Sequence, residues 1–233
     1  MKTSIIVPTY NEVETLPLLV PRILEVMPDA EIVVVDDDSP DGTAARAREL
    51  AKYAPVTVVQ RKNERGLATA VLRGLGEAQG EVCVVMDADL SHPVEAIALL
   101  VAAVEQGADV AVGSRYVAGS RTQGWSLARR LVSKVGTVLA RPLTPVRDPL
   151  SGFFCLRSSL LRDVELKPRG FKILLEILAR AEVKIVVEVP IRFADRETGA
   201  SKFSAREQRE FLTQLCSLYV RAVTRRWARG SRP

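Results

Sequence analysis

The chain has 233 residues, 47% of them hydrophobic, and carries a formal net charge of +5. This length and apolar content suit one α/β domain with a sizeable core and a small extension, and the longest apolar runs are far shorter than the roughly 18 residues that a membrane span needs. The basic excess favours phosphorylated ligands, an anionic membrane or nucleic acid, but an aromatic content of 5% argues against the last, so we predict no nucleic-acid partner.

Strands and helices alternate through the first half of the sequence. We predict strands over residues 3–8, 31–35, 56–60 and 82–86, with a helix after Asn11 and helices over 43–53 and 66–78. Asn11 and Glu14 fit a capping box, and Ser91 is the expected N-cap of the helix after the fourth strand. This alternation is typical of a doubly wound, mostly parallel sheet with helices on both faces.

Polar residues follow three of these strands where each strand ends, at positions 10–12, 36–38 and 87–89. Ligands of such sheets bind beyond the carboxyl ends of the strands, so we expect these residues to meet at one site. The motifs GxGxxG and GxxxxGK[ST] are absent, which argues against a nicotinamide site and a P-loop. A nucleotide would therefore be held by side chains and a metal.

Asp87 and Asp89 follow a buried apolar run directly. Two carboxylates at this point are unfavourable unless a cation meets them. Mg²⁺ and Mn²⁺ bind carboxylate oxygens and keep positions open for phosphates. The pattern predicts a Mg²⁺ or Mn²⁺ site here, with a solvated acidic turn as the alternative. His92 is the only histidine and there is no CxxC, which argues against zinc.

The second half begins with a predicted strand over 109–113 and a flexible link over 119–124. A helix over 127–141 has one apolar face and places Arg129 and Ser133 one turn apart, so both can contact one ligand. A solvated basic helix is the alternative. The remaining elements are a strand within 148–157, a helix over 170–179, a strand over 183–189 and a basic, mobile loop over 192–202.

The last predicted helix combines apolar and basic residues. Ser204 and Glu207 fit a capping box at its start. Apolar residues recur along one side at helical spacing: Phe211, Leu212, Leu215, Leu218, Tyr219, Ala222 and Val223. Arginines lie on the other side and continue into the tail. The helix either docks on its own domain or lies at the surface of an anionic membrane.

The cysteines and the N-terminal sequence indicate the cellular compartment of the protein. Cys83, Cys155 and Cys216 are far apart and odd in number, which suggests a reducing compartment. The N-terminus is strand-like and has no signal-peptide pattern. We therefore expect a cytoplasmic protein, peripheral on the cytoplasmic face of a membrane.

An ordered set of motifs then carries a family resemblance: PTYNE, DDDSPDGT, MDADLSHP, GSRYVAG, SGFF, GFKILLEIL and RETGASK. Over about residues 3–205 the sequence resembles inverting nucleotide-sugar transferases of the GT-A fold, and within them dolichyl- or polyprenyl-phosphate mannosyltransferases. The resemblance implies a catalytic domain over 1–205, followed by a membrane-interfacial amphipathic helix and basic tail over 206–233. It implies GDP-mannose as donor, a polyprenyl or dolichyl phosphate as acceptor and a membrane surface, and it leaves open a small integral-membrane partner.

The same resemblance implies roles for individual residues. Guanosine and ribose would be held by Pro8, Tyr10, Glu12, Val35 and Asp37. The diphosphate and metal would be bound by Asp87, Ala88 and Asp89. The acceptor phosphate would be held by Arg115, Arg129 and Ser133, and Arg196 and Lys202 would close over the donor. Some members have a metal-ligating Gln where this chain has Ser91, so Ser91 either ligates the metal, directly or through water, or only caps the helix.

The chemistry expected of such a site needs no strong base. A phosphate monoester is already anionic near neutral pH, arginine forks suit its oxygens, and a metal would stabilise the leaving diphosphate. A single displacement would invert the anomeric centre. Three alternatives remain: a UDP-glucose-dependent glucosyltransferase, a sugar-nucleotide pyrophosphorylase, for which the glycine-rich loop after the first strand is missing, and a non-catalytic basic membrane-binding module.

Overall fold

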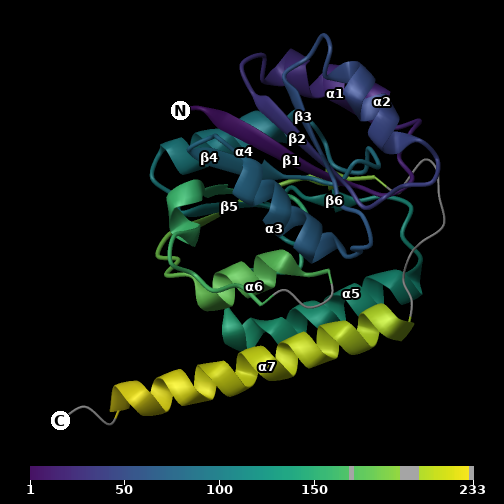
Figure 1. The fold of residues 1–233 in the computed structure, drawn as a ribbon. Coiled ribbons are helices and arrows are strands. Elements are labelled where there is room, and N and C mark those ends of the chain that lie inside the picture. Colours follow the sequence, from purple (N-terminus) through teal and green to yellow (C-terminus); the bar gives the residue numbers. More distant parts are fainter. Residues whose placement is uncertain (168–170, 195–204, 231–233) are drawn as a thin grey trace.

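A seven-stranded sheet forms the centre of the molecule, with helices on both faces (Figure 1). The computed structural model describes residues 1–167, 171–194 and 205–230. The strands run in the order β3 (Val56–Gln60), β2 (Glu31–Asp36), β1 (Thr3–Thr9), β4 (Val82–Val85), β7 (Phe154–Arg157), β5 (Val110–Ser114) and β8 (Val186–Pro190). Every neighbouring pair is parallel except those of β7, which runs antiparallel to β4 and β5. The mostly parallel, doubly wound sheet is thus confirmed.

The helices divide between the two faces because successive residues of a buried strand point to opposite sides. Ile5 of β1 packs in one core cluster with residues of α1 (Leu16–Val26), α2 (Thr43–Leu50) and α4 (Ala96–Glu105). Ile6 packs in a second cluster with residues of α3 (Leu67–Glu77) and α6 (Ile173–Arg180). Both side chains are fully buried, so the strand reads as a continuous apolar run.

Two more helices lie side by side beyond α6, α5 (Leu127–Ala140) and α7 (Ala205–Gly230) (Figure 1). Leu215 and Leu218 of α7 are buried against Ala140, Leu150 and Leu175. Other apolar residues of the same two helices stay at the surface, among them Leu127, Leu131, Val138, Leu212, Val220 and Val223. No helix in the described ranges has a stretch long and apolar enough to cross a membrane.

Two of the three predicted N-caps, Asn11 and Ser91, are wrong. α1 begins at Leu16 after Thr15, whereas Asn11 has a left-handed φ of 59° and its N–H donates to the Ser39 hydroxyl at 3.0 Å. α4 begins at Ala96, five residues beyond Ser91. In each case the predicted capping residue makes a hydrogen bond within the site loops, and the helix begins only after that loop.

The predicted flexible link over 119–124 is also wrong. It contains β6 (Arg121–Thr122), which pairs in parallel with β9 (Arg192–Phe193). Gly119 and Gly124 flank this strand with φ of 89° and 79°, values that favour glycine. The pairing ties the segment before α5 to the segment that follows β8, so neither is a free loop at this point. The predicted capping box at Ser204 and Glu207 lies outside the part of the chain whose side chains the structure describes.

Candidate active site

A cavity of about 650 Å³ opens at the carboxyl ends of the parallel strands. The residues that follow four of these strands line it: Tyr10 after β1, Asp37 after β2, Asp87 after β4 and Arg115 after β5. Helices α5 and α7, and the segment before α6, close the opposite wall. The predicted convergence of the strand ends on one site is therefore confirmed.

A buried ion pair between Asp37 and Arg61 lies under one end of the cavity. Arg61 Nε donates to Asp37 Oδ1 at 2.7 Å, and the Gly66 N–H donates to Oδ2 at 2.9 Å. Arg61 also donates to the carbonyl oxygen of Gly66 at 3.1 Å. These bonds fasten the loop between β3 and α3 to the end of β2. Asp37 thus shapes the cavity partly by holding a neighbouring loop in place.

Tyr10 and Glu12 line the same end from the loop after β1. The guanidinium of Arg65 lies 4.6 Å from the ring centre of Tyr10, within the range of a cation–π contact. The Glu12 carboxylate accepts a hydrogen bond from the Thr15 hydroxyl at 2.7 Å, and its N–H donates to the Thr43 hydroxyl at 2.9 Å. A flat aromatic surface beside a fixed carboxylate can hold a nucleoside by stacking and by hydrogen bonds to its hydroxyls.

Asp87 and Asp89 occupy the middle of the cavity wall. The N–H and hydroxyl of Ser91 both donate to Asp89 Oδ1, at 3.1 and 2.6 Å. The Asp87 N–H donates to Nδ1 of the buried His92 at 3.2 Å. A β-carbon at Gly152 would lie 3.3 Å from Asp87 Oδ2, so glycine keeps room beside this carboxylate. The Asp89 carboxylate is thus held by Ser91 and the Asp87 backbone by His92. Both aspartates line the cavity.

The donor set at this point fits a hard divalent cation only in part. Asp87 and Asp89 offer carboxylate oxygens, the ligands that Mg²⁺ and Mn²⁺ prefer. In the part of the chain that the structure describes, no group of three or more His, Cys, Asp and Glu residues is arranged to hold a metal. A cation bound here would take its other ligands from a phosphate and water, as Mg²⁺ commonly does.

Arg115 is buried against Asp148. Its Nε and Nη2 donate to Asp148 Oδ2 and Oδ1, each at 2.8 Å. Burial by itself would lower the pKa of this guanidinium, but the charge and hydrogen bonds of Asp148, with smaller contributions from Tyr116 and Asp87, raise the pKa above its ordinary value. Arg115 therefore remains a cation at all accessible pH values, and its orientation is set by Asp148.

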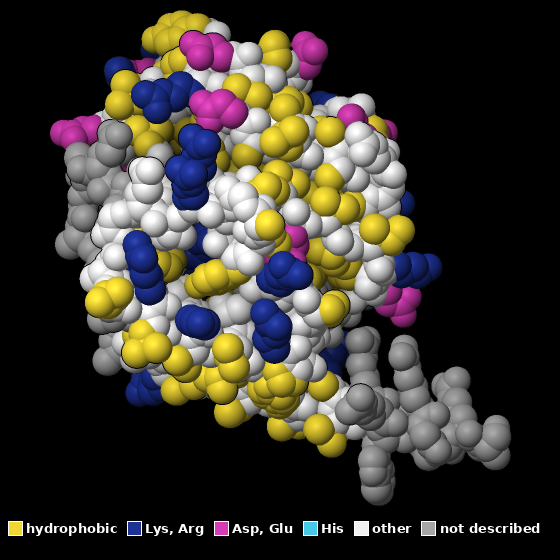
Figure 2. Space-filling model, turned by 180° about the vertical axis from the view of Figure 1, so that it is seen from behind, with side chains coloured by type: hydrophobic (Ala, Val, Ile, Leu, Met, Phe, Trp, Pro, Cys, Tyr) yellow, Lys and Arg dark blue, Asp and Glu magenta, His cyan; other side chains and the backbone are white. Residues whose placement is uncertain are grey.

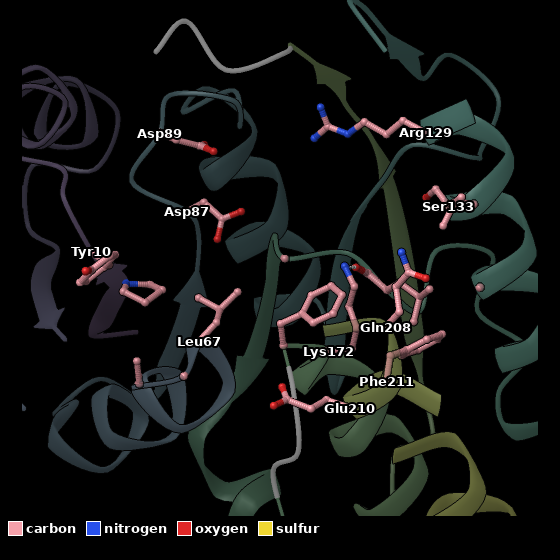
Figure 3. A pocket seen from close by; sticks show the side chains of 18 of the residues that line it. Tyr10, Leu67, Asp87, Asp89, Arg129, Ser133, Lys172, Gln208, Glu210 and Phe211 are labelled. Atoms are coloured by element: carbon pink, nitrogen blue, oxygen red, sulfur yellow. Dashed lines mark hydrogen bonds between the residues drawn. The ribbon is translucent and has the colours of Figure 1, made fainter. Parts of the chain in front are cut away.

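Arg129 and Ser133 face the two carboxylates across the cavity (Figure 3). The Trp125 ring contacts two arginines of the site, with its centre 4.5 Å from the Arg129 guanidinium and 5.2 Å from that of Arg115. The Ser133 hydroxyl lies 2.8 Å from the Tyr116 hydroxyl. Two guanidinium groups and a serine hydroxyl can together bind a phosphate group.

Phe211 lies in the lower part of the cavity in Figure 3 and belongs to an apolar portion of the cavity lining. Apolar lining residues come from α5, from the segments before β7 and before α6, and from α7: Val132, Val135, Leu139, Leu150, Phe171, Phe211 and Leu212. Lys172, Gln208 and Glu210 add polar groups there. An apolar wall beside two arginines suits a ligand with an anionic head and a hydrocarbon tail.

The cavity brings together most of the predicted site residues. Those that line it are Pro8, Tyr10, Glu12, Asp37, Asp87, Ala88, Asp89, Arg115, Arg129 and Ser133. Val35 is fully buried in β2 and Ser91 is bonded to Asp89, and neither lines the cavity. Arg196 and Lys202 lie outside the described residues.

Sequence reasoning missed several residues of the site: Arg65, His92, Trp125, Asp148, Lys172 and Phe193. The loop after β3 also lies at this edge of the sheet and carries Arg61 and Arg65, but the sequence prediction considers only the residues after the other three strands. Asp148 precedes an antiparallel strand, β7, so that it is the beginning of this strand that lies at the site. An argument built on parallel strand ends does not reach such a residue.

Comparison with known proteins assigns the family. The family model described as glycosyl transferase family 2 matches residues 4–166, which contain the Asp87 to Asp89 motif and the cavity arginines Arg65, Arg115 and Arg129. The chain belongs to glycosyl transferase family 2. The convergent strand ends, the carboxylate pair and the cavity thus belong to a family 2 glycosyltransferase.

Named members of the family are similar over most of the chain. A dolichol-phosphate mannosyltransferase of Pyrococcus furiosus is 47% identical over 94% of this chain, and this chain spans 64% of the length of that relative. A polyprenol monophosphomannose synthase of Mycolicibacterium smegmatis is 40% identical over 98% of this chain and 91% of its own length. A dolichol-phosphate mannosyltransferase of Saccharomyces cerevisiae is 38% identical, over 93% and 86%.

Solved structures show the same fold at lower identity. A glucosyl-3-phosphoglycerate synthase of Mycobacterium tuberculosis, in complex with Mg²⁺ and UDP, superposes with a TM-score of 0.73 at 21% identity. The superposition covers 93% of this chain and 79% of that one. Another structure of the same enzyme, with Mn²⁺, UDP and phosphoglyceric acid, also gives 0.73. At this identity the likeness establishes the fold alone.

Proposed function

We propose that this glycosyltransferase moves mannose from GDP-mannose to a polyprenyl phosphate such as dolichyl phosphate, with inversion at the anomeric carbon. The observation that carries the proposal is the composition of one cavity. A carboxylate pair, two arginines with a serine, and an apolar wall line the same space, so a charged donor and a lipid phosphate can meet there. The names of the relatives that are 38–47% identical support the transfer of mannose to a polyprenyl or dolichyl phosphate.

The nucleoside of the donor is proposed to lie at the Tyr10 end of the cavity. Tyr10 and Glu12 would contact guanosine and ribose, beside Pro8 and the loop that Asp37 holds. Val35 would support this end from below, since its backbone carbonyl accepts a hydrogen bond from the Thr9 hydroxyl at 3.4 Å. Arg196 and Lys202 remain proposed donor contacts.

Asp87 and Asp89 are proposed to hold the diphosphate through a divalent metal, Mg²⁺ or Mn²⁺. When bound, such an ion would offset the charge that develops on the leaving diphosphate. Ser91 would act from behind, because its two hydrogen bonds to Oδ1 fix the Asp89 carboxylate. The solved structures of the same fold that contain Mn²⁺ or Mg²⁺ are consistent with this use of a metal.

The acceptor phosphate is proposed to bind Arg129, Ser133 and Arg115. A phosphate monoester carries its own nucleophilic oxygen as an anion, so the protein must orient it and reduce its repulsion from the donor phosphates. Cys83, Cys155 and Cys216 do not line the cavity, so none of them is placed to act as a covalent nucleophile there. A single displacement, in which the acceptor phosphate oxygen attacks the anomeric carbon and GDP leaves, then inverts the configuration at that carbon.

The lipid tail is proposed to leave the cavity toward a membrane on which α5 and α7 rest. Figure 2 shows hydrophobic side chains along the lower edge of the molecule, the edge that α5 and α7 form in Figure 1, with Lys and Arg side chains above them. Leu131 of α5 and Val220 of α7 are 63% and 65% exposed. Apolar residues below basic ones suit anionic headgroups. The catalytic domain would thus span 1–205, and residues 206–233 would lie at the cytoplasmic membrane face.

The proposal is tested by product analysis. The protein is incubated with a polyprenyl phosphate and Mg²⁺ or Mn²⁺, with either GDP-mannose or UDP-glucose as donor, and the lipid product is identified by mass and by the configuration of its anomeric carbon. We expect a β-linked mannosyl phosphate lipid from GDP-mannose, and its loss on chelation of the metal. Transfer from UDP-glucose alone, or no transfer with an intact metal-loaded protein, would contradict the proposal.

A further inference from the structure

Asp148 holds Arg115 at three points. Besides the two side-chain bonds, the Arg115 N–H donates to Asp148 Oδ2 at 2.9 Å. A bidentate guanidinium–carboxylate pair fixes the plane of the guanidinium as well as its position. The third bond fixes the carboxylate relative to the end of β5. The direction in which Arg115 faces the cavity is therefore set by Asp148.

Asp148 is itself held by the sheet. The N–H groups of Arg147 and Asp148 donate to the Glu188 carboxylate at 2.8 and 3.0 Å. Glu188 belongs to β8, which pairs with β5 in parallel. Ser151, three residues after Asp148, donates its hydroxyl to the Gly113 carbonyl of β5 at 2.7 Å. The loop that carries Asp148 is thus anchored to both strands beside it.

The remaining sides of the Arg115 guanidinium face rings and a carboxylate. Its central carbon lies 5.2 Å from the ring centre of Trp125 and 5.7 Å from that of Phe193. Asp87 is close enough for its charge to act on Arg115. Arg115 reaches the cavity, whereas Asp148 is 0% exposed and does not line it.

We propose that Asp148 is a positioning residue that acts on the reaction only through Arg115. It aims the guanidinium at the acceptor phosphate and offsets part of its charge, so that Arg115 serves as a directed hydrogen-bond donor. This inference rests on the proposed function, since the acceptor phosphate is the group that Arg115 contacts there.

Two other roles for a buried aspartate can be set against this one. A general base must reach the proton that it removes, but both oxygens of Asp148 accept bonds from Arg115 and neither is exposed to the cavity. If Asp148 served folding alone, its substitution would affect the use of the donor and of the acceptor equally. A positioning role predicts a selective effect on the acceptor, and this effect should disappear when Arg115 is already gone.

The decisive experiment is a double-mutant cycle. Asp148→Asn, Arg115→Met and the double variant are compared for mannosyl transfer, for GDP-mannose binding by calorimetry and for thermal unfolding. The control is Asp109→Asn, because Asp109 also accepts backbone N–H bonds, from Lys184 and Ile185, at the opposite end of β5. The cycle measures whether the two side chains act as one unit.

We expect Asp148→Asn to lower kcat/KM for the acceptor at least about tenfold, the scale of a lost bond to a charged group. GDP-mannose affinity should change less than about threefold, and the shape of the pH–rate profile should stay that of the wild type. The double variant should match Arg115→Met within about twofold, since Asp148 has nothing left to position. Asp109→Asn should keep wild-type kcat/KM.

Three results would overturn the proposal. They are wild-type acceptor kinetics in Asp148→Asn, a further tenfold loss when Asp148→Asn is added to Arg115→Met, and the loss of an acidic limb from the pH–rate profile of Asp148→Asn. If Asp148→Asn does not fold, the double variant replaces it, because removing both partners of a buried pair avoids an uncompensated charge. The test is then the ratio of acceptor kcat/KM between the double variant and Arg115→Met.

A second measurement does not depend on transferase activity. In ¹⁵N spectra of the wild-type protein the Arg115 Nε–H should exchange slowly with water, because it is buried and bonded to Asp148. The signal should broaden or vanish in Asp148→Asn, and an unchanged signal overturns the positioning role. Absence of mannosyl transfer in the wild type would instead refute the proposed function. The ¹⁵N measurement would still test whether Asp148 positions Arg115.

Discussion

Asp89 is the residue whose charge should matter most for catalysis. Its Oδ1 accepts both bonds from Ser91, and Asp89→Asn preserves this acceptor while removing the charge that would offset a cation. We expect turnover to fall at least about 100-fold, since a metal stabilises the transition state by several kcal/mol. The melting temperature should stay close to that of the wild type.

The measurement for Asp89 is kcat at saturating metal together with thermal unfolding. Asp29→Asn is the matched control, because Asp29 is an exposed aspartate in the turn between α1 and β2. Turnover near the wild-type value in Asp89→Asn would remove this residue from the metal and diphosphate site.

Arg129 should act on the acceptor and not on the donor. It lies across the cavity from Asp87 and Asp89 (Figure 3), on the helix whose apolar side chains line the lower part of the cavity. Arg129→Ala should lower kcat/KM for the polyprenyl phosphate at least about tenfold and leave GDP-mannose affinity nearly unchanged. Arg129→Lys should recover only part of the loss, because the fork geometry is gone.

Two titrations on the same variant check this assignment, one of GDP-mannose binding and one of the rate against acceptor concentration. Arg130→Ala provides the control, since Arg130 is the exposed neighbour on the same helix. A variant at Arg129 that loses donor binding but keeps the acceptor KM would move this arginine to the donor side.

At the scale of elements, α5 and α7 present apolar residues on the surface while also packing on the domain. Deleting α7 is therefore a poor test of membrane binding. The deletion would also remove Leu215 and Leu218, which are only 4% and 1% exposed and belong to a core cluster. Removing them would expose Ala140 and Leu175 and destabilise the domain. Substitutions at exposed positions of the same helices test membrane binding without disturbing the core.

Leu131→Glu and Val220→Glu should weaken binding to liposomes that contain anionic lipids, each at least about threefold. Burial of one such side chain contributes roughly 1.5–3 kcal/mol when it is complete, and insertion at an interface is partial. The melting temperature should be unaffected, because both positions are more than half exposed. Liposome sedimentation at several lipid concentrations measures the effect.

Leu18→Glu is the matched control for these two variants, since Leu18 of α1 is 53% exposed on another element. Equal binding by Leu131→Glu and the wild type, or a wild-type protein that never sediments with the liposomes, would show that this edge does not face a membrane.

At the scale of the whole molecule, sequence reasoning works where structure follows from local pattern. The strands before Tyr10, Asp37 and Asp87 are buried on both faces, so each reads as an apolar run that ends in polar residues. Parallel pairing then carries these residues to one edge of the sheet. The first half of the fold and the donor side of the cavity could be predicted for this reason.

The errors have a common physical origin in long-range contacts. Asn11 and Ser91 look like helix caps, but in the site the backbone N–H of Asn11 donates to Ser39 and the hydroxyl of Ser91 donates to Asp89. The partnership of Arg115 with Asp148 depends on β7 running antiparallel between β4 and β5. No local pattern encodes which strand fills that position, so Asp148 could not be found from spacing.

The position of β7 also bears on how the chain folds during synthesis. β4 ends at Val85 and its second neighbour begins at Phe154, so the nascent sheet has an open hydrogen-bonding edge at its future centre until the later segment emerges. An unpaired, apolar central strand is a template for pairing with other chains. Closing this edge demands contacts distant in sequence, which slow folding. The strand that completes the site is thus also the one that ends the period in which the growing chain is most prone to aggregate.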